Sequence, residues 1–159
     1  MSWRGSVTVK ERIFACLPYL LPLIEGLMFG RFLFQQVPAL GLIFTPIYPV
    51  ILLYASIPFA GLIVFFALFM LVVRNESVAH FIRFNTMQAI LIDIVLVLCS
   101  LALQFVVQPL PGTGFALEIL SNTIFLGLIA AVGYAVVQSA IGRYAEIPTI
   151  SDAVHMQVR

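Results

Sequence analysis

Hydrophobic residues fall into four long runs along the chain, separated by short stretches that are polar or rich in proline and glycine. The four runs cover residues 13–34, 50–73, 86–107 and 115–141. Each run holds the roughly 20 residues that an α-helix needs to cross a bilayer. The pattern therefore predicts an all-α integral membrane protein with four transmembrane helices in a single membrane domain, residues 1–159, which ends in a polar tail, 143–159.

The first run is the least regular of the four because prolines and a charge interrupt it. Pro18 and Pro22 lie one turn apart and each removes a backbone donor, so we expect the helix to bend there. Glu25 lies inside the same run, and Gly26 and Gly30 form a G-x-x-x-G pair. Such a pair either lets another helix approach closely or accompanies the bend, and both interpretations stay open.

The connections between the runs also carry structural signals. Residues 35–48 are almost entirely apolar and contain two prolines, so we expect a broken segment that either re-enters the membrane or lies among the headgroups. Within the second run, Pro58 and Gly61 mark the expected position of a bend. Residues 108–114 are rich in proline and glycine, which predicts a tight turn between the last two runs and hence an antiparallel hairpin.

The composition excludes a water-soluble globular domain. Hydrophobic residues make up 62% of the 159 residues and charged residues only 9%, against about 25% charged in a typical soluble domain. The lipid bilayer is therefore the first partner that the sequence predicts. The net charge of +1 gives no reason to expect a nucleic-acid partner.

No catalytic residue, cofactor site or metal site is predicted. His80 and His155 are the two histidines, and neither lies in a nucleophile or zinc motif. Cys16 and Cys99 lie inside apolar runs, where a cysteine usually serves as a small hydrophobic residue. We therefore expect a protein that is not an enzyme.

The basic residues predict the orientation of the chain in the membrane. They fall in the N-terminal tail, in the connection between the second and third runs, and in the C-terminal tail: Arg4, Lys10, Arg12, Arg74, Arg83, Arg143 and Arg159. The remaining connections hold only Arg31. Because Lys and Arg concentrate on the inner side of membrane proteins, both termini are expected on the cytoplasmic or stromal side.

The third run carries a narrow polar stripe along an otherwise aliphatic helix. With about 100° per residue, Thr86, Ser100 and Gln104 lie within about 20° of Asp93 around the helix axis, and Asn85 lies beside them. A carboxylate at membrane depth costs about 2.5–3.5 kcal/mol even on the gentler insertion scale, so the stripe must face protein or water. It is either a polar seam that holds helices together or one wall of a hydrophilic path.

Other polar and small residues complete the candidate set. Further embedded or boundary polar residues are Glu25, Arg83, Gln88, Glu118 and Asn122. Residues expected to support close helix packing are Gly26, Gly30, Gly127, Ala131, Ala135 and Ser139. Glu25 and Asp93 have no Lys or Arg at matching depth in the chain. They are therefore protonated, hydrogen-bonded to other helices or exposed to water, or a partner subunit supplies the counter-charge.

Three blocks of sequence point to a known family: residues 11–26, the Ile57-Pro58-Phe59 region, and residues 83–93 with the pattern R-F-N-x-x-Q-A. Over residues 10–148 the chain resembles the Tic-twenty family, the small four-helix subunit of the protein translocon at the inner chloroplast envelope, with cyanobacterial and plastid-encoded relatives. A short basic N-terminus without a transit leader leads us to expect a cyanobacterial or plastid-encoded member that is mature from its first residue.

The resemblance implies a membrane subunit that helps to move preproteins across the inner plastid envelope, or performs the cyanobacterial counterpart of that step, as a proposed channel component. The expected partners are then other membrane subunits of a translocon-type complex and preprotein substrates. The alternative that stays open is a non-transporting scaffold or assembly subunit, whose polar seam only holds helices together. A small-solute carrier is disfavoured because the sequence lacks an inverted repeat.

Overall fold

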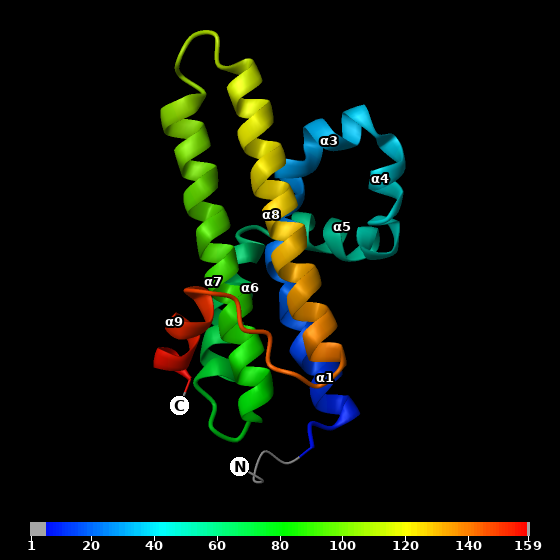
Figure 1. The fold of residues 1–159 in the computed structure, drawn as a ribbon, viewed down its shortest axis with the longest axis vertical. Helices are drawn as coiled ribbons and strands as arrows, with labels where there is room; N and C mark the ends of the chain where they lie inside the picture. Colours follow the sequence, from blue (N-terminus) through cyan, green and yellow to red (C-terminus); the bar gives the residue numbers. More distant parts are fainter. Residues whose placement is uncertain (1–5, 159) are drawn as a thin grey trace.

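The computed structural model describes residues 6–158, and this part of the chain forms helices and no strand. Two long helices form a hairpin that runs the length of the structure. The first arm is α7 (His80–Ala102), extended by a π-helical turn (Leu103–Val107), and the second arm is α8 (Gly114–Ala140). The connecting turn between them lies at one end of the molecule (Figure 1). Gly112 has a φ of 75°, a left-handed conformation that glycine adopts without a Cβ penalty, so it suits this tight turn.

The N-terminal segment is one long apolar element made of short pieces. It consists of α1 (Val9–Cys16), a 3₁₀ turn (Leu17–Tyr19), α2 (Leu20–Gly26), a second 3₁₀ turn (Leu27–Gly30) and α3 (Arg31–Gln36). A reciprocal capping box between Thr8 and Glu11 begins α1. The first 3₁₀ turn contains Pro18, which cannot donate a backbone hydrogen bond. At Pro18, where the sequence predicts a bend, the structure has a short stretch of tighter 3₁₀ helix.

The segment expected as one span over residues 50–73 is sharply broken. After α4 (Pro38–Leu42) and a 3₁₀ turn (Thr45–Ile47) come α5 (Tyr48–Ser56), α6 (Ala60–Leu68) and a π-helical turn (Phe69–Val73). The parts on either side of the break at residues 57–59 differ in direction by 103°. Phe59, directly after Pro58, has a left-handed φ of 57° and lies at the point where the chain changes direction. Figure 1 shows α3, α4 and α5 on one side of the bundle, beside α8.

The broken segment affects the number of membrane spans. Three helices in the described part of the chain are long and apolar enough to cross a membrane: Val9–Gln36, His80–Val107 and Gly114–Ala140. The bent pair Thr45–Ser56 and Ala60–Val73 makes a fourth only if its two parts count as one span. The chain is thus an all-helical protein with three to four candidate membrane-spanning helices.

The polar tail expected at residues 143–159 contains a helix, α9 (Ile150–Gln157), that packs against α7. Val154 is fully buried in a cluster with Phe84, Met87 and Ile90 of α7. Between α8 and α9 the ring of Tyr144 packs edge-on against Phe84. The tail is therefore part of the folded structure and covers the N-terminal part of α7.

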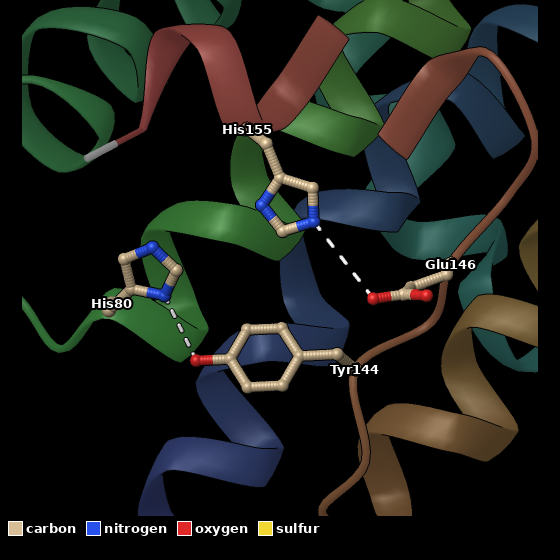
Figure 2. Close-up of polar contacts among 4 residues, drawn as sticks. All are labelled: His80, Tyr144, Glu146 and His155. Atoms are coloured by element: carbon tan, nitrogen blue, oxygen red, sulfur yellow. Dashed lines mark hydrogen bonds and ion pairs between the residues drawn. The ribbon is translucent and has the colours of Figure 1, made fainter. Parts of the chain in front are cut away.

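Polar contacts hold the same tail in place. The hydroxyl of Tyr144 lies 2.9 Å from Nδ1 of His80, the first residue of α7, and His155 of α9 lies 4.0 Å from Glu146 (Figure 2). His155 and Glu146 are both largely exposed, so their pairing adds little stability. The apolar contacts of Val154 are the main attachment of α9.

The main core lies where the N-terminal segment packs between α7 and α8. It includes Tyr19 and Phe29 of the first segment, Leu96 of α7, and Phe125 and Leu128 of α8. These side chains exclude water and lipid from the middle of the bundle. The polar residues discussed below lie at the edges of this core.

The glycine pair of the first segment faces α8. A Cβ atom at Gly26 would overlap the side chain of Leu128, and one at Gly30 would lie 2.9 Å from the ring of Phe125. Side chains larger than hydrogen at these positions would thus push the first segment away from α8. Gly26 and Gly30 lie at the point of closest approach between the two segments.

The small residues expected as a ridge on α8 have different surroundings. Ala135 and Ser139 are fully buried, Ala131 is half-buried, and a Cβ atom at Gly127 would meet no other group. The ridge therefore packs within the chain only along the half nearer the end of α8. The other half is on the surface of this chain.

Candidate functional site

The polar stripe begins with a hydrogen-bonded network centred on Asn85. Its Oδ1 accepts hydrogen bonds of 2.8 Å from the hydroxyls of Tyr19 and Ser139, and its Nδ2 donates to the carbonyl oxygen of Phe81. Gln88 donates a 3.0 Å bond to the Tyr19 hydroxyl. Asn85, Gln88 and Ser139 are 0% exposed. One amide therefore joins the first segment, α7 and α8.

This network is a helix seam in which most polar atoms have partners. Buried polar groups without partners cost about 1–3 kcal/mol each, so the paired groups stabilise one relative placement of the three segments. Thr86 bonds within its own helix, to the carbonyl oxygen of Ile82. Arg83 donates to the carbonyl oxygen of Val73, which fixes the start of α7 to the end of the α6 segment. Oε1 of Gln88 has no hydrogen-bond partner.

Farther along α7, the stripe reaches Asp93, which lies near a second acidic residue, Glu25 of α2. Asp93 of α7 is 5% exposed, and its Oδ1 has no hydrogen-bond partner. Glu25 of α2 lines the same cavity, of about 270 Å³, and accepts a hydrogen bond from the hydroxyl of Tyr54 on α5. Gly61 of α6 lies directly against this pair, since a Cβ atom there would overlap Glu25 and meet the Tyr54 hydroxyl. The break between α5 and α6 thus brings a phenol to an intramembrane carboxylate.

The end of the stripe nearer the turn of the hairpin lines a more polar cavity. Ser100 and Gln104 form part of a hollow of about 430 Å³ between α7, α8 and the first segment. Arg31, Gln108 and Ser121 contribute further polar groups to its lining. Gln104 is exposed and Ser100 is half-buried. The five residues of the stripe therefore have four different surroundings. Asn85 lies in a closed seam, Asp93 in an acidic cavity, and Ser100 and Gln104 in an open polar hollow. Thr86 lines a separate, mostly apolar cavity.

Two more of the candidate residues lie near the start of α8. Glu118 accepts a hydrogen bond from Gln36, the last residue of α3, and so joins the first segment to the part of α8 nearer the hairpin turn. Asn122 is half-buried, and its Oδ1 has no partner. Ser121, the residue before Asn122, is buried and lines the same polar hollow as Ser100 and Gln104.

Sequence reasoning did not find the tyrosines that complete these contacts. Tyr19 and Tyr54 lie in apolar stretches, where a buried phenol hydroxyl normally has a hydrogen-bond partner. That rule is the signal that would have identified both residues. Ser139 was assigned to close packing alone, while its hydroxyl also donates to Asn85.

Comparison with known proteins extends over the same part of the chain. A family model described as "Chloroplast import apparatus Tic20-like" matches residues 8–154. The chain is 53% identical to the "Tic20 family protein" of Synechocystis sp. over 159 residues, which cover 100% of this chain and 99% of that protein. It is 38% identical to "Protein TIC 20-II, chloroplastic" of Arabidopsis thaliana, covering 99% of this chain and 78% of the relative.

A plastid relative of red algae gives a similar result. The "Tic20 family protein Ycf60" of Gracilaria tenuistipitata var. liui is 32% identical over 160 residues, which cover 97% of this chain and 78% of that protein. The matches thus span the N-terminal segment, both arms of the hairpin and most of α9. On this evidence the chain is a multi-pass membrane protein that belongs to the Tic20 family.

Proposed function

We propose that the chain is a membrane subunit of a protein-translocation complex, acting in preprotein import across the inner plastid envelope or in the cyanobacterial counterpart of that step. The observation that carries the proposal is the match of the family model to residues 8–154, which includes every described helix from α1 to α8 and most of α9.

The proposed orientation has both termini on the cytoplasmic or stromal side. Arg12 at the start of the first segment lies beside Gly142 at the end of α8, and His80 at the start of α7 contacts Tyr144. Basic residues 10, 12, 74, 83 and 143 therefore gather at one end of the bundle, while Arg31 lies near the other. This asymmetry supports an inner location for the basic end.

A polypeptide path, if the subunit contributes one, is proposed along the outer hollow lined by Ser100 and Gln104. The network around Asn85 is too fully hydrogen-bonded to serve as the wall of an aqueous path within one chain. The outer hollow has polar groups on both sides and is open. A complete path would then need further chains to close it.

The second candidate function is a non-transporting scaffold subunit of the same kind of complex. The observation that favours it is the same network, since Asn85 fixes three segments relative to one another. A rigid bundle of this kind suits a subunit whose surface holds other subunits. The apolar surface of α5, on which no side chain is buried within the chain, offers such a contact area.

Photo-crosslinking in the native membrane separates the two functions. A photoreactive amino acid replaces Gln104 in one strain and Phe105 in the other, because the two positions have the same depth and face different directions. A preprotein arrested during translocation should crosslink to position 104 and not to position 105. If both positions crosslink to other membrane subunits and not to the preprotein, the scaffold function remains. If neither position crosslinks to a preprotein or to a translocon subunit, both functions are contradicted.

A further inference from the structure

The cavity between α2, α6 and α7 contains two carboxyl groups and an apolar mouth. We propose that it is a docking site for a single basic side chain, Lys or Arg, carried in the middle of an apolar membrane helix of another polypeptide. The site is formed by Glu25 and Asp93, with Tyr54 and Gly61 beside them. This inference rests on the proposed function, because it assumes that the chain works within a membrane complex.

Asp93 is the feature that points to a missing ligand. Its side chain is 5% exposed and lines the cavity, yet its Oδ1 has no hydrogen-bond partner. The carboxyl group of Glu25 in the same cavity has one partner, the Tyr54 hydroxyl. A buried acidic oxygen without a partner is rare because its desolvation is not compensated. The cavity therefore has acceptor capacity that the residues around it do not fill.

The residues around the cavity supply no counter-charge. The groups that face Asp93 are Glu25 from α2 and Tyr54 from α5, while α6 contributes Gly61, Leu62 and Phe65. No Lys or Arg occurs among the described residues that line it. A positive charge must therefore come from outside the chain if the two carboxyl groups are to be paired.

The shape and lining of the cavity favour a long basic side chain over water or a metal ion. Water can bond to the two carboxyl groups, but it brings no counter-charge and makes no contact with the apolar side chains that form most of the lining. Hard metal ions take about six to eight oxygen ligands, whereas three or more metal-ligating side chains do not cluster anywhere in residues 6–158. A Lys or Arg side chain has an apolar stem that matches apolar walls and a charged end that reaches the carboxyl groups.

The mouth of the cavity suits an approach from within the membrane. Ile94, Val97 and Leu98 of α7 and Leu62 of α6 line it, and all four are exposed on the surface of the chain. An apolar helix can pack on these side chains while its one basic residue enters the cavity. A soluble basic peptide lacks the apolar surface for this contact.

The test uses the full chain in phosphatidylcholine vesicles and a synthetic helix of about 23 Leu and Ala residues, enough to span the bilayer. One peptide has Lys at its centre, a second has Leu there, and a third has the Lys moved two turns toward one end. Each carries a photoreactive residue next to the central position. The crosslinked sites are identified by mass spectrometry.

The central-Lys peptide should crosslink to residues 62, 94 and 98 at least about tenfold more efficiently than the other two peptides, since loss of one partner of a buried charge pair weakens binding strongly. The double variant Glu25→Gln, Asp93→Asn should lose this preference, and the control Glu118→Gln should keep it. Equal crosslinking by the Lys and Leu peptides, or a preference that survives the double variant, would overturn the proposal.

The comparison of the three peptides on the unaltered chain remains decisive if the double variant does not fold. This experiment is also independent of the preprotein crosslinking described above. Failure of the peptides to discriminate removes the docking site and leaves the translocon function intact. Failure of the preprotein and subunit crosslinks removes that function, while a positive peptide result would still assign the cavity a basic ligand.

Discussion

The phenol hydroxyl of Tyr19 donates a 2.8 Å hydrogen bond to Oδ1 of Asn85, across 66 positions of the chain. The same oxygen accepts a hydrogen bond from the hydroxyl of Ser139, which follows Asn85 by 54 positions. A single amide in the first turns of α7 thus fixes the register of the N-terminal segment and of α8. The first residue of the polar stripe therefore has a structural role, since it connects three segments of the bundle.

Replacement of Asn85 by Ala should destabilise the protein by about 1–3 kcal/mol, because it leaves the buried hydroxyls of Tyr19 and Ser139 without their acceptor. The measurement is reversible unfolding in mixed detergent micelles. Asn122→Ala is the matched control, since the side-chain oxygen of Asn122 has no partner. Equal losses in the two variants would contradict the assignment of Asn85 as the centre of the seam.

Enlarging Gly26 should separate the first segment from α8. A methyl group at this position overlaps Leu128, so Gly26→Ala should cost about 1–3 kcal/mol in the same unfolding assay. Gly127→Ala on α8 provides the comparison, because its added methyl group meets nothing within the chain and alanine favours the helix. A Gly26→Ala variant as stable as the Gly127→Ala variant would show that the two segments are not in close contact.

The attachment of α9 to α7 depends on the buried side chain of Val154. Val154→Asp places a charge among Phe84, Met87 and Ile90, so α9 should detach and become sensitive to protease while the membrane bundle stays folded. Met156→Asp, at a position that is 76% exposed, should leave the cleavage rate unchanged. If the two variants were cleaved at the same rate, α9 would not be packed as described.

The left-handed conformation of Phe59 makes a further prediction about the break between α5 and α6. Phe59 is largely exposed, so its replacement removes little packing within the chain. Gly adopts this conformation without the penalty of about 1–2 kcal/mol that other residues have, so Phe59→Gly should be more stable than Phe59→Ala. A more stable Ala variant would indicate that residues 57–59 are helical and that the two helices form one continuous span.

Much of the fold follows from the hydrophobic pattern because the length of an apolar run is a local property. The C-terminal ends of the segments Val9–Gln36, His80–Val107 and Gly114–Ala140 lie within two residues of the runs expected from the sequence, while the first and second of these segments begin four and six residues earlier than expected. The all-helical class follows in the same way. The sharp break at residues 57–59 does not, since Pro58 permits a slight kink as readily as a change of direction by 103°.

The candidate site was less accessible from sequence. Helical spacing places Asn85 and Asp93 on one side of α7, yet it cannot say which residues of other helices face them. The partners Tyr19, Tyr54 and Ser139 are determined by the rotation and depth of neighbouring helices, which depend on packing of the whole bundle. Spacing alone also treats the stripe as one unit, whereas its end nearer the hairpin turn opens into a separate hollow.

The measurement that most directly tests the division of the stripe is a cysteine scan along α7 with a membrane-impermeant thiol reagent, in a chain with Cys16 and Cys99 replaced by Ser. Positions 100 and 104 should react several times faster than position 95, an exposed apolar position that lines neither the polar hollow nor the acidic cavity, because they line the open polar hollow. Position 85 should stay unreactive, because it is closed inside the seam. Rapid labelling at position 85 would show that water reaches the seam and would contradict its closure.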